Sequence, residues 1–103
     1  MEDKLEPNQS QKFVVVETLG GDYLLRGDVN AKWHKDIVDK MMANGSSISR
    51  VIGGGRIMVD TTSEKIYVWD TSHNYGGVPF NVCKKLLEKM YDYTVLDAVP
   101  EKL

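Results

Sequence analysis

Two segments of the sequence carry apolar residues at the spacing of an α-helix, and short β-branched runs lie between and around them. Apolar side chains three and four residues apart fall on one face of a helix, so this spacing predicts amphipathic helices over residues 33–43 and 79–91. Asn44-Gly45 follows the first segment, where glycine favours the end of a helix. The apolar stripes consist of Trp33, Ile37, Val38, Met41 and Met42 in the first helix, and of Phe80, Cys83, Leu86, Leu87 and Met90 in the second.

Six further segments have the composition and length of β-strands. Gly20-Gly21-Asp22 joins the first two as a hairpin turn, and Gly53-Gly54-Gly55 separates the third from the fourth. The order ββαβββαβ predicts an α/β domain of the α+β type, with two helices on a mixed, largely antiparallel sheet of about six strands. The predicted strands cover residues 13–19, 23–26, 47–52, 56–60, 65–70 and 93–99.

The length of 103 residues leaves room for one hydrophobic core, so a single domain over residues 12–103 is expected. Residues 1–11 are polar and are expected to form a disordered tail. No apolar run approaches the roughly 20 residues of a membrane helix, and the acidic N-terminus lacks the apolar region of a secretory signal. The single cysteine, Cys83, excludes an internal disulfide and is expected in the helix core. The sequence therefore predicts a cytoplasmic protein with no membrane partner, and nothing in it suggests more than a monomer.

The charge balance and the motifs exclude several classes of function. Lys and Arg number 13 against 15 Asp and Glu, a formal net charge of -2, so the basic excess of a general nucleic-acid-binding protein is missing. No Cys/His cluster suggests a zinc site. No Gly-x-Ser-x-Gly surrounds Ser72, and Gly53-Gly54-Gly55-Arg56 precedes a strand pattern rather than the helix of a dinucleotide fingerprint.

His34 stands at the predicted start of the first helix. Position alone favours a surface or capping histidine. A helix start also offers unpaired N–H groups and a positive dipole, which attract an anion and lower the pKa of an adjacent histidine. A neutral imidazole there could accept a proton or a phosphoryl group.

Three other features could contribute to an anion site. The Gly triplet is most simply a strand connection or bulge, but it would also allow close backbone approach beside Arg56. The loop from Thr71 to Gly76 is either an ordinary connection or a nest of N–H groups around the Ser72 hydroxyl. Lys12 and Arg26 flank short strands, where basic residues are usually just solvated.

Several of these segments share their order and spacing with one family. They are Trp33-His34-Lys35-Asp36-Ile37-Val38-Asp39-Lys40, Gly53-Gly54-Gly55-Arg56-Ile57, Lys65-Ile66-Tyr67-Val68-Trp69, Ser72, Tyr75-Gly76 and Asp92-Tyr93-Thr94-Val95. With them the chain resembles the phosphohistidine phosphatase (janus) family over about residues 12–99. The aromatic-His-x-Asp-Ile segment together with Gly-Gly-Gly-Arg-Ile is the most specific part of this resemblance.

The resemblance implies a small phosphatase that removes phosphate from histidine-phosphorylated proteins, with phospholysine as an alternative substrate, and that uses no metal or other cofactor. His34 stands at the family's catalytic histidine, as a general base or as a nucleophile. The implied substrate-binding residues are Lys12, Arg26, Arg56, Ser72, His73 and Asn74. The alternative function is a catalytically weak module that binds phosphate or phosphoproteins.

The chain also departs from the family pattern. Asp70-Thr71 replaces what is usually Gly-Tyr, which puts an acidic residue near a predicted anion site. Strand alternation is expected to turn Asp70 away from that site. His73 and Asn74 replace less polar residues, so the preferred substrate could differ from that of the relatives.

Overall fold

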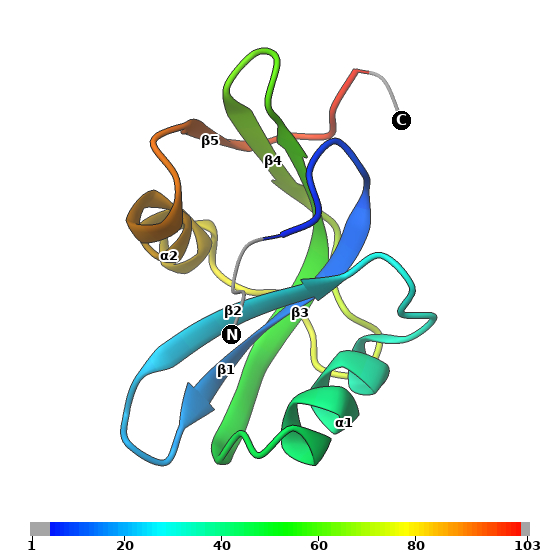
Figure 1. Ribbon diagram of the computed structural model, residues 1–103, viewed down its shortest axis with the longest axis vertical. Coiled ribbons are helices and arrows are strands. Elements are labelled where there is room, and N and C mark those ends of the chain that lie inside the picture. Colours follow the sequence, from blue (N-terminus) through cyan, green and yellow to red (C-terminus); the bar gives the residue numbers. More distant parts are fainter. Residues whose placement is uncertain (1–4, 102–103) are drawn as a thin grey trace.

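The computed structural model describes residues 5–101 and contains one five-stranded sheet with two helices (Figure 1). The strands lie in the order β2-β1-β3-β4-β5. All neighbouring pairs are antiparallel except β4 and β5, which are parallel, so the sheet is mixed as predicted. The elements are β1 (Gln11–Thr18), β2 (Tyr23–Asp28), α1 (His34–Ala43), β3 (Ile48–Asp60), β4 (Lys65–Trp69), α2 (Phe80–Met90) and β5 (Thr94–Asp97).

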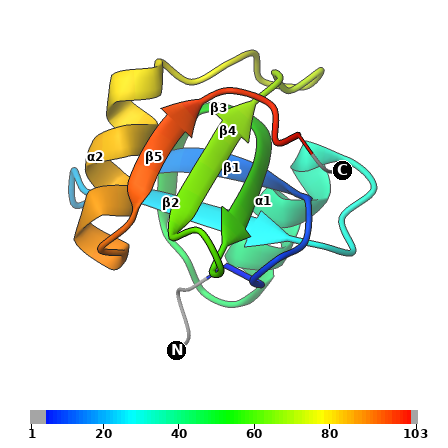
Figure 2. The ribbon, with the colours of Figure 1, turned by 90° about the horizontal axis from the view of Figure 1, so that it is seen from above.

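The two helices cover opposite faces of the sheet, as Figure 2 shows. Strand β1 lies inside the sheet, and its side chains alternate between the two cores. Phe13 and Val15 belong to the core under α2, whereas Val14 and Val16 pack with α1. Burial on both faces explains why residues 13–16 of this strand form an unbroken apolar run instead of an apolar–polar alternation. Neither helix of the described residues is long and apolar enough to cross a membrane.

The two strands predicted on either side of the Gly triplet form one continuous strand, β3. Gly53, Gly54 and Gly55 pair with Val15, Val14 and Phe13 of β1, so the glycines lie inside the ladder rather than in a connection. The sheet therefore has five strands instead of about six, in the order ββαββαβ. Glycine is needed there for close packing: a Cβ on Gly54 would lie 2.8 Å from His34 Cδ2.

The sequence pattern placed the start of ordered structure at Lys12. In the structure, packed residues begin earlier in the chain. Leu5 is buried, and the N–H of Asn8 donates to Val59 O at 2.7 Å. Gln11 is buried and already part of β1. Only residues 1–4 of the predicted tail lie outside the described part of the chain.

Candidate functional site

A cavity of about 520 Å³ opens where the N-terminus of α1 meets β1, β3 and the loop that follows β4. Figure 1 shows this loop passing beside the start of α1. Most of the predicted site residues line the cavity, although they come from four separate parts of the sequence. The lining consists of Lys12, Lys32, Trp33, His34, Arg56, Asp70, Thr71, Ser72 and His73.

His34 is the first residue of α1, and its imidazole is buried against β3. Its Nε2 lies 2.8 Å from the carbonyl oxygen of Gly55. A carbonyl oxygen can only accept a hydrogen bond, so Nε2 carries the proton and Nδ1 of the neutral ring is unprotonated. Nδ1 makes no hydrogen bond with the described residues, and no buried side-chain nitrogen or oxygen among them lacks a partner. Nδ1 is therefore open to the cavity and free to accept a proton or bond.

The surroundings of His34 lower the pKa of its imidazole below the ordinary value of 6.5. Burial is the largest cause, and the positive charges of Lys12 and Arg56 act in the same direction. The hydrogen bond to Gly55 and the charge of Asp70 oppose the shift. The direction predicted from the helix dipole is confirmed, but desolvation is its main origin.

Lys12 and Arg56 face each other across the β1–β3 pair and supply positive charge to the cavity wall. Lys12 makes no ion pair or hydrogen bond with any residue in the described range. Lys32 adds a third cation, which the sequence analysis missed. Its place two residues before His34, in the segment that leads into α1, was the available signal.

Ser72 organises the loop after β4 through its side-chain oxygen. This oxygen accepts the N–H groups of Asn74 and Tyr75, both at 3.1 Å, and the N–H of Ser72 donates to Gly54 O at 3.0 Å. Between Ser72 and Gly76 only the N–H of His73 has no partner within residues 5–101. The predicted nest of free amides is therefore reduced to one donor, and the main role of Ser72 is to hold the loop against β3.

Asp70 does not point away from the site, so the prediction from strand alternation is wrong. The residue follows the last position of β4 and has a φ of 69°, in the left-handed region, so the alternation of the strand no longer applies to it. Its Oδ2 lies 3.2 Å from Arg56 Nε, and it lines the cavity. A carboxylate therefore stands among the cations.

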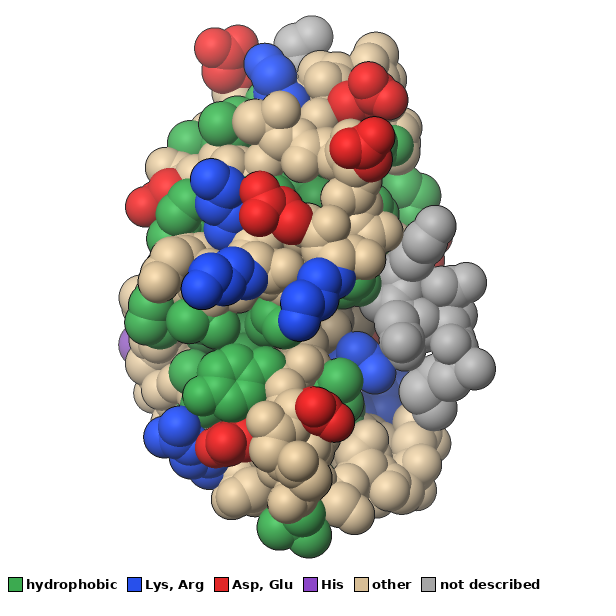
Figure 3. Space-filling model, turned by 90° about the vertical axis from the view of Figure 1, so that its left-hand side faces the viewer, with side chains coloured by type: hydrophobic (Ala, Val, Ile, Leu, Met, Phe, Trp, Pro, Cys, Tyr) green, Lys and Arg blue, Asp and Glu red, His purple; other side chains and the backbone are tan. Residues whose placement is uncertain are grey.

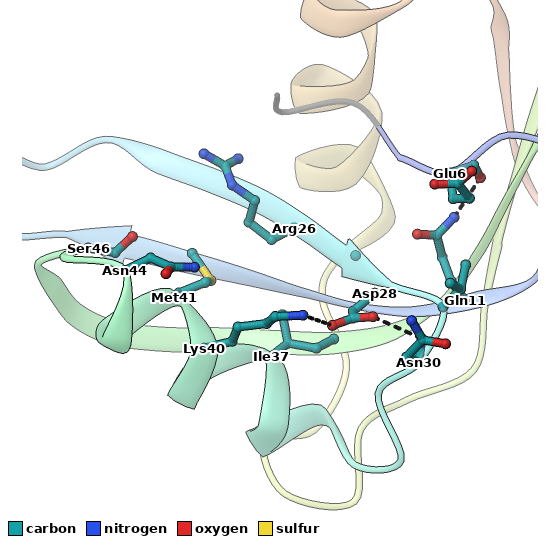
Figure 4. Close-up of a pocket in the computed structure, with 12 residues that line it drawn as sticks. Glu6, Gln11, Arg26, Asp28, Asn30, Ile37, Lys40, Met41, Asn44 and Ser46 are labelled. Carbon is teal, nitrogen blue, oxygen red and sulfur yellow. Dashed lines mark hydrogen bonds and ion pairs between the residues drawn. The ribbon is translucent and has the colours of Figure 1, made fainter. Parts of the chain in front are cut away.

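Asn74 and Arg26 lie outside this cavity. Asn74 Oδ1 accepts the N–H of Lys35 at 3.3 Å and so ties the loop to the first turn of α1. Arg26, on β2, lines a separate cavity of about 330 Å³ near the ion pair of Asp28 and Lys40 (Figure 4). Its Nη1 donates to Leu25 O at 3.1 Å.

Cationic side chains also gather elsewhere on the surface. Figure 3 shows Lys and Arg side chains on the side of the molecule where α2 lies, and Lys84, Lys85 and Lys89 are exposed on this helix. These lysines stand on the opposite side of the sheet from α1. What sets the cavity apart is the combination of its cations with an unprotonated imidazole nitrogen.

The fold and the site define a small α+β domain whose basic cavity holds a neutral, hydrogen-bonded histidine. More specifically, the chain belongs to the Janus/Ocnus family, because the family model Ocnus matches residues 4–95. This stretch contains every residue that lines the cavity. No curated protein matches the chain.

Proposed function

We propose that this protein is a phosphohistidine phosphatase that hydrolyses the P–N bond of histidine-phosphorylated proteins without a metal ion. The observation that carries the proposal is the unprotonated Nδ1 of His34, fixed by the hydrogen bond from Nε2 to Gly55, in a cavity that Lys12, Lys32 and Arg56 also line. A monomer that acts on cytoplasmic proteins is part of the proposal, as is phospholysine as an alternative substrate.

Charge neutralisation and positioning are the main requirements of phosphoryl transfer. Lys12, Arg56 and the N–H of His73 are the donors that would hold the phosphoryl oxygens. The P–N bond needs little further help, because a protonated imidazole is a good leaving group. The proposal requires no contact between Arg26 and the phosphoryl group, and it gives Ser72 and Asn74 the role of positioning the loop.

Two routes are open to Nδ1 of His34. As a general base it takes a proton from water while the water oxygen attacks phosphorus. As a nucleophile it attacks phosphorus itself, and water then hydrolyses the phosphorylated enzyme. In both routes the electrons of the P–N bond pass to the leaving nitrogen, and the products are histidine and inorganic phosphate. Trapping of a phosphorylated protein that is absent in His34→Ala distinguishes the second route from the first.

The direct test is phosphate release from a phosphohistidine peptide in the presence of a chelator. We expect release by the wild type and none by folded His34→Ala. Lys12→Ala should raise KM by about tenfold, the effect of losing roughly 1.4 kcal/mol of charge interaction, whereas the surface variant Lys84→Ala should behave as the wild type. Activity that survives in His34→Ala contradicts the assignment. Phosphate binding without turnover favours the binding module instead.

A further inference from the structure

Asp70 is held in an uncommon conformation that directs its carboxylate to the cavity. Non-glycine residues seldom adopt a positive φ, and such positions concentrate at functional sites. One carboxylate oxygen, Oδ1, accepts the N–H of Thr71 at 2.9 Å, and the other lies 3.2 Å from Arg56 Nε. The carboxylate is thus anchored from both sides, by its own loop and by β3.

The contact of Arg56 with Asp70 is made by Nε of the guanidinium. The two Nη groups of Arg56 donate no hydrogen bond to any residue in the range 5–101, so their N–H groups are available to a phosphoryl group. If a phosphoryl group binds to the Nη groups of Arg56, the same guanidinium contacts both the phosphoryl group and the Asp70 carboxylate. Asp70 is half exposed, so its charge also reaches the space of the cavity.

This negative charge affects two kinds of phosphoryl compound in opposite ways. A phosphomonoester brings only negative charge to the cavity, and the carboxylate repels it. A phosphoryl group on a protonated imidazole or amine carries a positive charge one bond away from phosphorus, and the carboxylate attracts that charge. The repulsion of phosphomonoesters and the attraction of a protonated nitrogen both help to discriminate between these two kinds of phosphoryl compound.

We propose that Asp70 is a specificity-determining residue, which favours substrates whose phosphoryl group is bonded to a protonated nitrogen and disfavours phosphomonoesters. This inference rests on the proposed function and deepens it. Trp33 supports the same ligand, because its side chain is half exposed and lines the same cavity. The face of an indole attracts cations and stacks on planar rings.

The test compares the binding of two small probes, phosphoramidate, whose nitrogen is protonated at neutral pH, and inorganic phosphate. Dissociation constants are measured in a His34→Ala background, so that neither probe is turned over, with Asp70→Asn and the control Asp92→Asn added to it. Asn keeps an acceptor for the N–H of Thr71 and tolerates the left-handed conformation. We expect Asp70→Asn to reduce the preference for phosphoramidate over phosphate roughly three- to fivefold, the size typical of one half-exposed charge pair, and Asp92→Asn to leave it unchanged.

Equal weakening of both probes in Asp70→Asn would mean that Asp70 only positions Arg56, and it would overturn the inference, as would an unchanged preference. The comparison of dissociation constants does not depend on whether the protein hydrolyses phosphohistidine. A protein that shows the shift in preference but releases no phosphate from phosphohistidine refutes the proposed activity and keeps the recognition by Asp70. A protein that is active but shows no shift refutes only the role of Asp70.

Discussion

At the scale of single residues, the chemistry of the cavity depends on which nitrogen of His34 carries the proton. The carbonyl of Gly55 fixes the proton of the neutral ring on Nε2, and burial lowers the pKa of the imidazole, which favours that neutral form. A lower pKa means that a smaller fraction of the imidazole is protonated at mildly acidic pH. Nδ1 therefore remains available as an acceptor at pH values where an exposed histidine is largely charged.

The lowered pKa predicts the pH dependence of activity. The acidic limb of the pH profile of kcat/KM reports the essential groups of the free enzyme. Its midpoint should lie below the ordinary histidine pKa of 6.5. Asp70→Asn removes a charge that raises the pKa of His34, so the limb should move to still lower pH in that variant. The measurement is the pH profile of kcat/KM with a phosphohistidine peptide. A limb above 6.5 in the wild type contradicts the prediction.

The same shift has a consequence for stability. The unfolded chain binds a proton at His34 at a higher pH than the folded protein does, so this contribution to the free energy of unfolding is present above 6.5 and is lost as the pH falls below it. Any acid destabilisation that His34→Gln abolishes would therefore come from this imidazole.

At the scale of secondary-structure elements, β3 connects the site to the sheet. Its three glycines let the strand pass under the imidazole of His34 and beside the loop that Ser72 holds. A bulkier residue at Gly54 would meet Phe13 O at 2.5 Å, His34 Cδ2 at 2.8 Å and Ser72 Cβ at 3.3 Å. His34 and Ser72 belong to the site, so a side chain at position 54 would disturb both the packing of β3 and the arrangement of the site residues.

We therefore expect Gly54→Ala to lower the free energy of unfolding by about 1–3 kcal/mol, the usual cost of overpacking, and to reduce activity in the molecules that remain folded. Gly20→Ala is the matched control, because its nearest contact would be Thr18 Oγ1 at an ordinary 3.8 Å. Urea denaturation of both variants gives the comparison. Equal stability of the two would show that β3 can move away from the imidazole.

At the scale of the whole molecule, the sheet separates two cores, and the cavity that contains His34 lies on the α1 side. Cys83 belongs to the other core, where α2 packs on the sheet. It is fully buried, and burial raises the pKa of its thiol to about 12. The expectation of a cysteine in the helix core is confirmed.

This burial predicts that Cys83 reacts with a thiol reagent only when the domain unfolds. At about pH 8 the buried thiol has almost no reactive thiolate, so labelling of the native protein should be slow and should accelerate with added urea along the unfolding transition. Phosphatase activity should be little changed in Cys83→Ala, because the residue lies away from the cavity. Fast labelling of the folded protein would contradict this account.

The helices and most strands were predictable from the sequence, because a period of 3.6 or 2 is a local property of the chain. Residues 33–43 and 79–91 were predicted as helices, and α1 and α2 lie within one residue of these bounds at each end. The glycine triplet was different, because a strand interior and a loop look alike in isolation. Only the pairing with β1 made residues 53–55 part of a strand.

The sequence by itself determined the two helices, most of the strands and the residue types available for an anion site. Tertiary structure decided how those residues are used: the proton on Nε2 of His34, the loss of free amides in the Ser72 loop, the inward carboxylate of Asp70 and the separation of Arg26 from the cavity. The physical reason is that each of these depends on contacts or separations between segments distant in the sequence, such as His34 with Gly55, or on a single backbone angle at the end of a strand. Contacts between distant segments and a single backbone angle leave no periodic signal in the order of the amino acids.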